Sequence, residues 1–184
     1  ILEICRNLDV DNFLYASSSS VYGSNKLVPF KENHNVDHPV SLYAATKKSN
    51  EVMAHCYSSL FKIPATGLRF FTVYGPWGRP DMALFIFCKA ILQEEFIEIF
   101  NQGDMKRDFT YIDDIVESIY KLIFKIPSRN KEYNVKVPDP SSSWAPYKIF
   151  NIGNSEPIEL NKYIAAIEDS LGMEAKKQLL PIQL

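Results

Sequence analysis

A tyrosine and a lysine four positions apart have the clearest chemical potential in the sequence. Tyr43 and Lys47 form a Y-x-x-x-K pattern in "SLYAATKKSNEV", and residues four apart on a helix lie on one face. A free tyrosine has a pKa of about 10, and a neighbouring cation lowers that pKa because it favours the phenolate. Ser18 lies upstream in the serine run of "YASSSSVYGS", and its hydroxyl could hydrogen-bond the same substrate hydroxyl whose proton Tyr43 takes. Such a set would interconvert an alcohol and a ketone at a nicotinamide cofactor.

Each of these patterns has a simpler interpretation when it is taken alone. A Y-x-x-x-K pattern occurs by chance in many helices as a solvated tyrosine and lysine, and a serine run is more often a linker. Their order along the chain favours the chemical interpretation. A strand ends in serine, a long loop follows, and the tyrosine and lysine come on the next helix.

The pattern of apolar residues predicts the elements that hold these side chains. "FLYASS" predicts a buried strand that ends in the serine run. Residues 23–39 are polar and have no period, which predicts a long surface loop. Apolar residues at helical spacing predict a helix over residues 42–61, which Pro64 ends. "TGLRFFTVYG" predicts a second strand, so that Thr72, after "LRFF", also lies at the end of a strand.

The second half of the chain continues this alternation. We expect a helix in "MALFIFCKAILQ", a helix that Asp113-Asp114 caps, and a last helix over residues 160–171. Residues 127–147 are rich in proline, serine and charge, which predicts a mobile, irregular excursion. Short strands are expected in "FIEIF", "RDFTYI" and "KIFNIGN". The alternation indicates an α/β fold with a mainly parallel sheet, and such sheets bind ligands at the carboxyl ends of their strands.

The composition excludes several other classes of protein. Hydrophobic residues make up 46% of the 184-residue chain and charged residues 23%, which is typical of a globular protein. A net charge of −2 with scattered Lys and Arg predicts neither a nucleic-acid nor a membrane-surface partner. No apolar run approaches the ~20 residues of a membrane span. Three cysteines and three histidines lie at no metal-ligand spacing, so we predict no metal site and free thiols in a reducing cytoplasm.

Several long motifs occur together and in order along the chain. They are "YASSSSVYG", "HPVSLYAATKKSNE", "GLRFFTVYGPWGRPDMALF", "KRDFTYIDDI" and "FNIGN". On these motifs the chain resembles the extended short-chain dehydrogenase/reductases, the NAD-dependent epimerases and dehydratases of nucleotide sugars. Within them it looks most like the bacterial UDP-glucuronate 4-epimerases. The resemblance covers essentially the whole chain and implies an NAD cofactor, a UDP-sugar substrate, a homodimer and a place in cytoplasmic polysaccharide biosynthesis.

The resemblance also implies catalytic and cofactor-binding roles. Ser18, Tyr43 and Lys47 would form the catalytic triad. Tyr43 would be base and acid beside the cofactor, and Lys47 would lower the pKa of Tyr43 while binding the nicotinamide ribose. Phe70 and Thr72 would line the pocket of the nicotinamide and the sugar. In the reaction so implied, Tyr43 takes the proton of the sugar 4-hydroxyl while C4 gives hydride to NAD. The transient 4-keto sugar turns over, and hydride returns to its other face.

Substrate binding is implied at four further positions. Ser19 and Ser20 would face the sugar, at the places where the related dehydratases resemble "TDEVYG" and carry an Asp-Glu pair that removes water. Because both carboxylates are replaced by serines, the resemblance favours epimerisation over dehydration. Arg79 in "GPWGRPD" would bind the carboxylate of a uronic acid, although its simpler interpretation is a solvent-exposed loop arginine. Arg107 in "KRDF" would grip the UDP pyrophosphate with its charged donor fork.

One part of the family pattern does not occur in this sequence. A dinucleotide fold needs a Gly-rich turn after its first strand, but none of the 7 glycines forms G-x-x-G-x-x-G. In the family this motif lies ahead of the point where the sequence begins. We therefore expect a fragment without the N-terminal Gly-rich half. Residues 1–75 would be the remaining part of a Rossmann-like NAD-binding domain, and residues 76–184 would be mostly a small α/β substrate-binding region with helices that cover the sheet.

Three functions remain open on the sequence alone. The chain could be a segment of a UDP-glucuronate 4-epimerase that is active once a Gly-rich half is supplied, if necessary by a complementing N-terminal chain. It could instead be the non-catalytic remnant of a split gene, which binds no NAD. A UDP-glucose/galactose 4-epimerase is the third possibility.

Overall fold

The computed structural model describes residues 1–181 and contains two compact units. The first unit comprises residues 1–71 and 113–153, and the second comprises residues 72–112 and those from 154 onward. The chain returns to the first unit because β6 (Tyr147–Ile152) pairs with β2 (Ala65–Phe70). The boundaries of these compact units differ from the expected domain boundary between residues 75 and 76. That domain boundary stays a prediction.

The first unit is built on a three-stranded parallel sheet. Its strand order is β1-β2-β6, with β1 at Phe13–Ser18. The last residues of the three strands, Ser18, Phe70 and Ile152, lie in one register row, so that the carboxyl ends meet at one edge. This arrangement confirms the predicted α/β fold with a parallel sheet.

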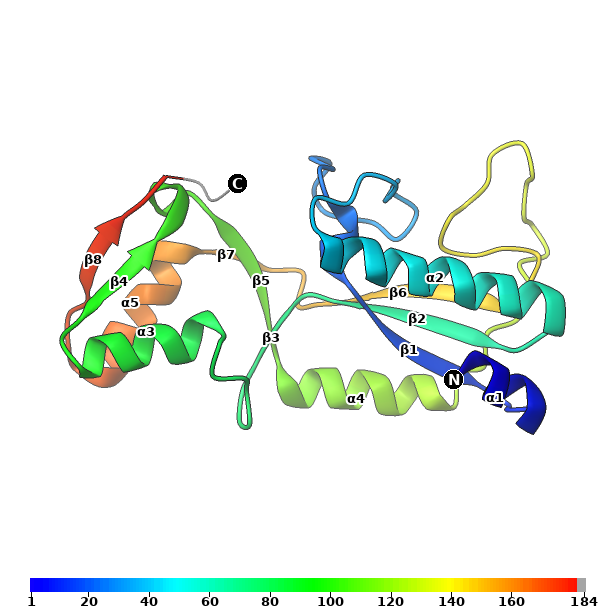
Figure 1. The fold of residues 1–184 in the computed structure, drawn as a ribbon, viewed down its shortest axis with the longest axis horizontal. Coiled ribbons are helices and arrows are strands. Elements are labelled where there is room, and N and C mark those ends of the chain that lie inside the picture. Colours follow the sequence, from blue (N-terminus) through cyan, green and yellow to red (C-terminus); the bar gives the residue numbers. More distant parts are fainter. Residues whose placement is uncertain (182–184) are drawn as a thin grey trace. The chain divides into compact units, whose positions relative to one another are not determined.

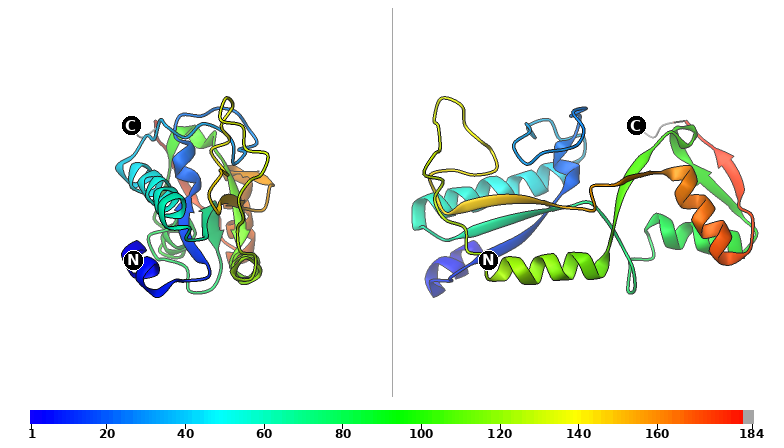
Figure 2. Two further views of the ribbon diagram at one scale, coloured as in Figure 1. Left: turned by 90° about the vertical axis from the view of Figure 1, so that its right-hand side faces the viewer. Right: turned by 180° about the vertical axis from the view of Figure 1, so that it is seen from behind.

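Helices cover both faces of this sheet (Figures 1 and 2). α2 (Leu42–Phe61) packs on one face, where α1 (Leu2–Leu8) also contacts it, and α4 (Ile112–Ile123) runs along the opposite face. The α2 boundaries agree with the sequence prediction. Ser41 caps its start by accepting a hydrogen bond from the Ala44 N–H (3.1 Å), and the chain leaves the helix before Pro64, as that residue requires.

The face of α2 that lies on the sheet carries small or polar side chains. They recur at helical spacing and are Ala44, Glu51, Ala54 and Ser58. The sheet matches this with Gly67, where an added Cβ would stand 2.5 Å from the Tyr15 hydroxyl. The space that Gly67 leaves lets the Tyr15 and Tyr147 hydroxyls hydrogen-bond across it at 3.2 Å. Burial raises the pKa of both tyrosines, so both stay neutral.

Glu51 and Arg69 form an ion pair between α2 and β2. Their side chains are 2% and 0% exposed. Arg69 Nε and Nη2 donate to the two Glu51 carboxylate oxygens at 2.9 and 3.0 Å, the two-pronged geometry that makes arginine–carboxylate pairs strong. Burial opposes the charge on Arg69, but its bonds to Glu51 outweigh that effect and raise the pKa of the guanidinium. The first unit thus holds a two-pronged ion pair in its interior.

The two predicted loops differ in how they pack. Residues 23–39 form the expected irregular loop, and Gly23 closes its base with φ +53° while Ser24 N–H bonds the His38 carbonyl. Residues 124–146 are also irregular, apart from an isolated bridge at Ser142. The prediction that 127–147 is an excursion throughout is wrong at its C-terminal end. Four residues just before β6 are buried: Ser141, Ser142, Ser143 and Ala145. Tyr147 already belongs to β6.

The second unit has its own sheets and core. β3 (Thr72–Tyr74), β5 (Lys106–Tyr111) and β7 (Pro157–Glu159) form one sheet, and β4 (Phe96–Ile99) pairs with β8 (Lys176–Leu179) in another. α3 and α5 pack on each other and on β4 and supply the core. α3 spans Ala83–Leu92 and α5 spans Leu160–Leu171. The core residues of the two helices and β4 are Phe87, Ala90, Ile91, Ile97, Ile99, Ile164 and Ile167.

Two local predictions need correction, and two short strands were not predicted. "TGLRFFTVYG" is not one strand, because the chain leaves the first sheet at Phe71 and Thr72 opens β3, which pairs with β5 in the second unit. Asp113 and Asp114 do not cap α4 but lie in its first turn, where carboxylates still favour the helix dipole. The short strands β7 and β8 lack the alternation of apolar residues that would have predicted them.

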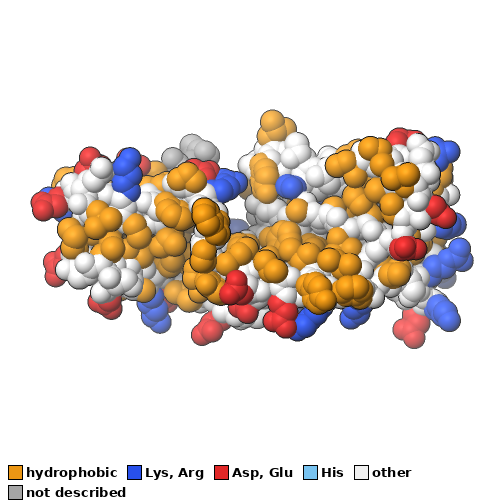
Figure 3. Space-filling view, turned by 90° about the horizontal axis from the view of Figure 1, so that it is seen from below, with side chains coloured by type: hydrophobic (Ala, Val, Ile, Leu, Met, Phe, Trp, Pro, Cys, Tyr) orange, Lys and Arg blue, Asp and Glu red, His pale blue; other side chains and the backbone are white. Residues whose placement is uncertain are grey.

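Apolar side chains also lie on the surface. Figure 3 shows many of them on one face, and the exposed ones of α4 include Val116, Tyr120 and Ile123. Within the described residues, β1 has β2 as its one strand partner. Open strand edges and apolar patches of this kind are interaction sites or aggregation liabilities.

We predict that Arg69→Met lowers the free energy of unfolding by about 3–5 kcal/mol, because it leaves the Glu51 carboxylate buried without its partner. Replacing both residues, Arg69→Met with Glu51→Leu, should recover much of this loss since no charge then remains inside. Urea unfolding followed by circular dichroism measures both effects.

Lys106→Met is the matched control for that series. Lys106 and Glu159 also link two elements at 3.5 Å, but both side chains are more than half exposed, and such pairs contribute little. An Arg69→Met protein as stable as Lys106→Met would contradict the role given to the buried pair.

Candidate functional site

Tyr43 and Lys47 lie together at the start of α2. The Lys47 Nζ stands 5.7 Å from the centre of the Tyr43 ring and donates a hydrogen bond to the Ala16 carbonyl of β1 at 3.1 Å. The ammonium is thereby held between the first turns of α2 and the end of β1. The Tyr43 side chain is 55% exposed, and within residues 1–181 no hydrogen bond to its hydroxyl is present, so the phenol is open to a ligand.

The serine run divides into residues with different surroundings. Ser17 is buried, and its Oγ donates to Glu51 Oε1 at 2.6 Å. Ser18, the last residue of β1, turns to the other side and caps the short 3₁₀ helix η1 (Ser19–Tyr22), accepting the Ser20 N–H at 3.2 Å. Its Oγ also bonds Ser20 Oγ at 3.0 Å. Ser19 is half-buried and Ser20 is exposed, so hydroxyls gather at the carboxyl end of β1.

Phe70 ends β2 directly beside Ser18 in the strand register. Six of the first unit's predicted site residues therefore come from two structural positions: the carboxyl end of the sheet and the first turns of α2. Ser18, Ser19, Ser20 and Phe70 belong to the former, and Tyr43 with Lys47 to the latter.

The other predicted binding residues belong to the second unit. Thr72 is the first residue of β3. Arg107 is exposed on β5, where its backbone pairs with Ile158. Arg79 is exposed in the turn before α3, and its guanidinium bonds both carboxylate oxygens of Asp81, at 3.0 and 2.5 Å. Arg79 thus already holds a carboxylate of its own chain.

The described part of the chain contains no cluster of His, Cys, Asp and Glu side chains that could hold a metal ion. None of the helices in residues 1–181 combines the length and the apolar character that a membrane crossing requires.

The sequence profile of the "NAD dependent epimerase/dehydratase family" matches residues 1–135, which include the serine run, Tyr43 and Lys47. The chain belongs to this family. Among curated relatives of this epimerase/dehydratase chain, Protein CapI of Staphylococcus aureus is 59% identical over 183 residues. A probable UDP-glucuronate 4-epimerase of Rhizobium meliloti (strain 1021) is 47% identical over 184 residues.

A solved structure shares the fold of this family member. The UDP-glucuronic acid 4-epimerase from Bacillus cereus, in complex with UDP-glucuronic acid and NAD, superposes with a TM-score of 0.77 at 33% identity. The match covers 98% of this chain and 52% of the Bacillus cereus chain. The two relatives are likewise matched over 100% of this chain and over 55% and 54% of their own length. The chain thus spans about half the length of the proteins it matches.

Sequence reasoning missed the buried hydrogen-bond network around Arg69, which supports the serine run and the start of α2 from inside the first unit. Arg69 bonds Glu51 and, through Nη1, the Tyr22 hydroxyl at 3.1 Å; Tyr22 in turn bonds Asn151 Oδ1 at 2.7 Å. Glu51 bonds Ser17. One signal was available: an arginine inside the apolar strand "GLRFF" must have a buried partner.

We predict that Ser17→Ala lowers the free energy of unfolding by about 1–3 kcal/mol, because the buried Glu51 carboxylate loses one of its hydrogen-bond donors. The urea midpoint measures this change. Ser20→Ala is the matched control, since the exposed hydroxyl can be replaced by water. Equal stability of the two variants would show that the bond from Ser17 contributes nothing.

Proposed function

We propose that this chain is part of an NAD-dependent UDP-sugar 4-epimerase, and that its sugar is glucuronate, converted to galacturonate. The observation that carries the proposal is the Tyr43–Lys47 pair held against the carboxyl end of β1, where Ser18 ends the strand. Family membership supports it, and so do the relatives that act on UDP-glucuronate by name.

Three side chains would share the proton transfer. Tyr43 would take the proton of the sugar 4-hydroxyl and later return it, which needs a phenol open to the ligand. Lys47 would supply the positive charge beside the ring that favours the phenolate during the transfer. Ser18 would hydrogen-bond the reacting oxygen and keep it within reach of Tyr43.

The residues present fit one end of an NAD molecule. Lys47 uses one of its three N–H donors on the Ala16 carbonyl, which leaves two for the hydroxyls of the nicotinamide ribose. Tyr43 and Phe70 would lie beside the nicotinamide. When bound, NAD would supply reversible hydride exchange at the sugar C4. The pyrophosphate would need the Gly-rich turn that this sequence does not contain.

The two expected domains would divide the binding of NAD and of the substrate between them. Residues 1–75 would serve NAD, and residues 76–184 would serve mostly the substrate. Ser19 and Ser20 would face the sugar, and without carboxylates at these two positions the site has no acid–base pair for removing water. Thr72 would complete the sugar pocket. A homodimer and a complementing N-terminal chain stay predictions.

Two arginines would bind the anionic parts of the substrate. Arg107 would take the pyrophosphate, for which an exposed and permanently charged donor fork is suited. Arg79 would bind the uronate carboxylate by exchanging it for Asp81, which it holds in the same two-pronged way. This exchange is what would separate a uronate from a neutral hexose.

The two alternatives differ in measurable ways. A non-catalytic remnant would bind no NAD in its native form, so NAD bound to the native polypeptide would exclude it. A UDP-glucose/galactose 4-epimerase would prefer the neutral sugar and would not depend on Arg79.

We predict that Tyr43→Phe in the native polypeptide abolishes epimerisation, with a loss of at least about 10²–10⁴-fold in kcat, because the proton acceptor is removed. Interconversion of UDP-glucuronate and UDP-galacturonate, followed by chromatography, measures this. Tyr120→Phe is the matched control, an exposed tyrosine of α4. Near-normal turnover by Tyr43→Phe would remove Tyr43 from its role.

We predict that Arg79→Gln raises KM for UDP-glucuronate about tenfold or more while KM for UDP-glucose stays unchanged, because only the uronate loses a charged contact. Initial-rate kinetics with both sugars measure this split. Arg129→Gln, an exposed loop arginine in the first unit, is the control. An equal rise for both sugars would argue against a carboxylate contact and in favour of a general effect on the turn.

A further inference from the structure

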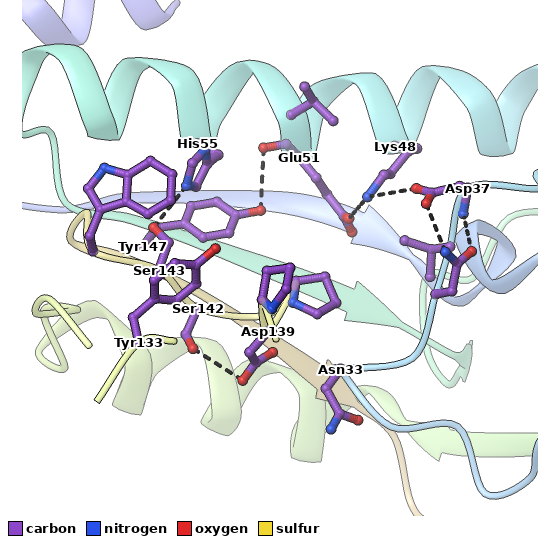
Figure 4. Close-up of a pocket in the computed structure, with 16 residues that line it drawn as sticks. Asn33, Asp37, Lys48, Glu51, His55, Tyr133, Asp139, Ser142, Ser143 and Tyr147 are labelled. Carbon is purple, nitrogen blue, oxygen red and sulfur yellow. Dashed lines mark hydrogen bonds and ion pairs between the residues drawn. The ribbon is translucent and has the colours of Figure 1, made fainter. Parts of the chain in front are cut away.

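A cavity of about 460 Å³ lies within the first unit (Figure 4). Its walls are α2, the loop around residues 33–37, and the loop of residues 133–144. From α2, Lys48, Glu51 and His55 face it at helical spacing, and none of the residues proposed for catalysis lines it. Its volume falls in the roughly 300–1,000 Å³ range of small-ligand sites.

One wall of the cavity is aromatic and firmly held. The Trp144 ring has the ring of His55 edge-on at 5.4 Å and that of Tyr133 at 5.2 Å. Trp144 Nε1 donates to Ser59 Oγ at 3.2 Å, and His55 Nε2 bonds Ser143 Oγ at 2.8 Å. Burial lowers the pKa of His55. Trp144 is nevertheless 49% exposed, so an aromatic surface is available to a ligand without rearrangement.

The charged groups around the cavity are already compensated. Lys48 Nζ lies 3.9 Å from carboxylate oxygens of both Asp37 and Glu51, and Glu51 is paired with Arg69. Asp139 accepts hydrogen bonds from Ser141 N–H, Ser141 Oγ and Ser142 Oγ. These bonds outweigh the effect of burial and hold the pKa of Asp139 below its ordinary value.

This balance disfavours ions of either sign. An anion would meet the carboxylates of Asp37, Glu51 and Asp139, which outnumber the one lysine among the lining residues. A nucleotide is excluded by the same repulsion, which separates this cavity from a UDP-sugar site. An organic cation would meet Lys48, and it would find each carboxylate either ion-paired or occupied by hydroxyl and amide donors.

The polar groups that remain suit a ligand with many hydroxyls. Asn33 is exposed and lines the cavity, and its amide offers both donors and an acceptor. Asn35 and Asp37 hold each other at 2.8 Å on the same loop, and carboxylate oxygens can accept further hydrogen bonds from hydroxyls. A pyranose ring combines such hydroxyls with a face of C–H groups that stacks on an aromatic ring.

We propose that this cavity is a second binding site, for a neutral saccharide ring stacked on Trp144 and hydrogen-bonded by Asn33 and Asp37. Sugar hydroxyls can both donate hydrogen bonds to these polar groups and accept them. They add no charge to a cavity whose charged groups already have partners. The ligand would be either a single sugar or the end residue of a glycan.

The two tryptophans of the chain provide a direct test. The sequence holds Trp77 and Trp144 only, and Trp77 is fully exposed in the second unit. In the Trp77→Phe protein all tryptophan fluorescence therefore comes from Trp144. Titration with methyl glucoside or methyl galactoside should give a saturable change with a Kd of about 1 mM or tighter. The matched Trp144→Phe protein should give none.

Asn33→Ala, made in the Trp77→Phe background, should weaken that binding about tenfold or more, and it keeps the test open if Trp144→Phe fails to fold. If a trisaccharide binds more tightly than the methyl glycoside of its end residue, the ligand is the end of a glycan. If the two bind equally tightly, the ligand is a single sugar ring. Three results would overturn the proposal: no saturable change with any sugar, an equal change in Trp144→Phe, or saturation by tetramethylammonium but not by sugars. Because NAD and UDP-sugars take no part, the outcome is independent of epimerase activity.

Discussion

The ion pair of Glu51 and Arg69 is the interaction on which the first unit depends. It joins β2 to α2, and its further bonds reach Ser17 at the end of β1 and Tyr22 after it. Two full charges without contact to water are stable only where each has a complete set of partners. The strand end, the 3₁₀ helix and the helix of Tyr43 must therefore keep their relative positions for the pair to survive.

This constraint explains how the proposed catalytic edge of the sheet can be open to a ligand while its side chains are still held in place. Tyr43 and Ser20 are exposed, and a hydroxyl at the surface has no packing of its own to hold it. One layer below, Ser17 and Glu51 are buried and hydrogen-bonded. A functional group that faces a ligand is positioned best when rigid elements and buried contacts support it from behind. The two neighbouring serines divide the two tasks, since Ser17 donates to Glu51 of α2 and Ser18 caps the 3₁₀ helix η1.

α2 connects the two sites considered for the first unit. Its first turns present Tyr43 and Lys47 to the carboxyl edge of the sheet, while Lys48, Glu51 and His55 face the cavity beside Trp144. Glu51 contributes to both regions, because its carboxylate supports Ser17 and its side chain also lines the cavity. The charge balance that disfavours ions in the cavity thus depends on the same ion pair that supports the proposed catalytic edge.

The sequence by itself determined the parallel α/β fold, the helix of Tyr43 and Lys47, and the family, because these depend on local periodicity and on motifs whose order survives in the chain. Tertiary structure alone decided the partner of Arg69, the burial of Ser141–Ser143 and the separate surroundings of Ser17 and Ser18. It also decided that "TGLRFFTVYG" divides between two sheets. Local patterns show that a charge or a serine lies in an apolar segment. Which group compensates it depends on segments 18 to 129 residues away along the chain, such as Glu51 for Arg69 and Asn151 for Tyr22, and only folding brings these together.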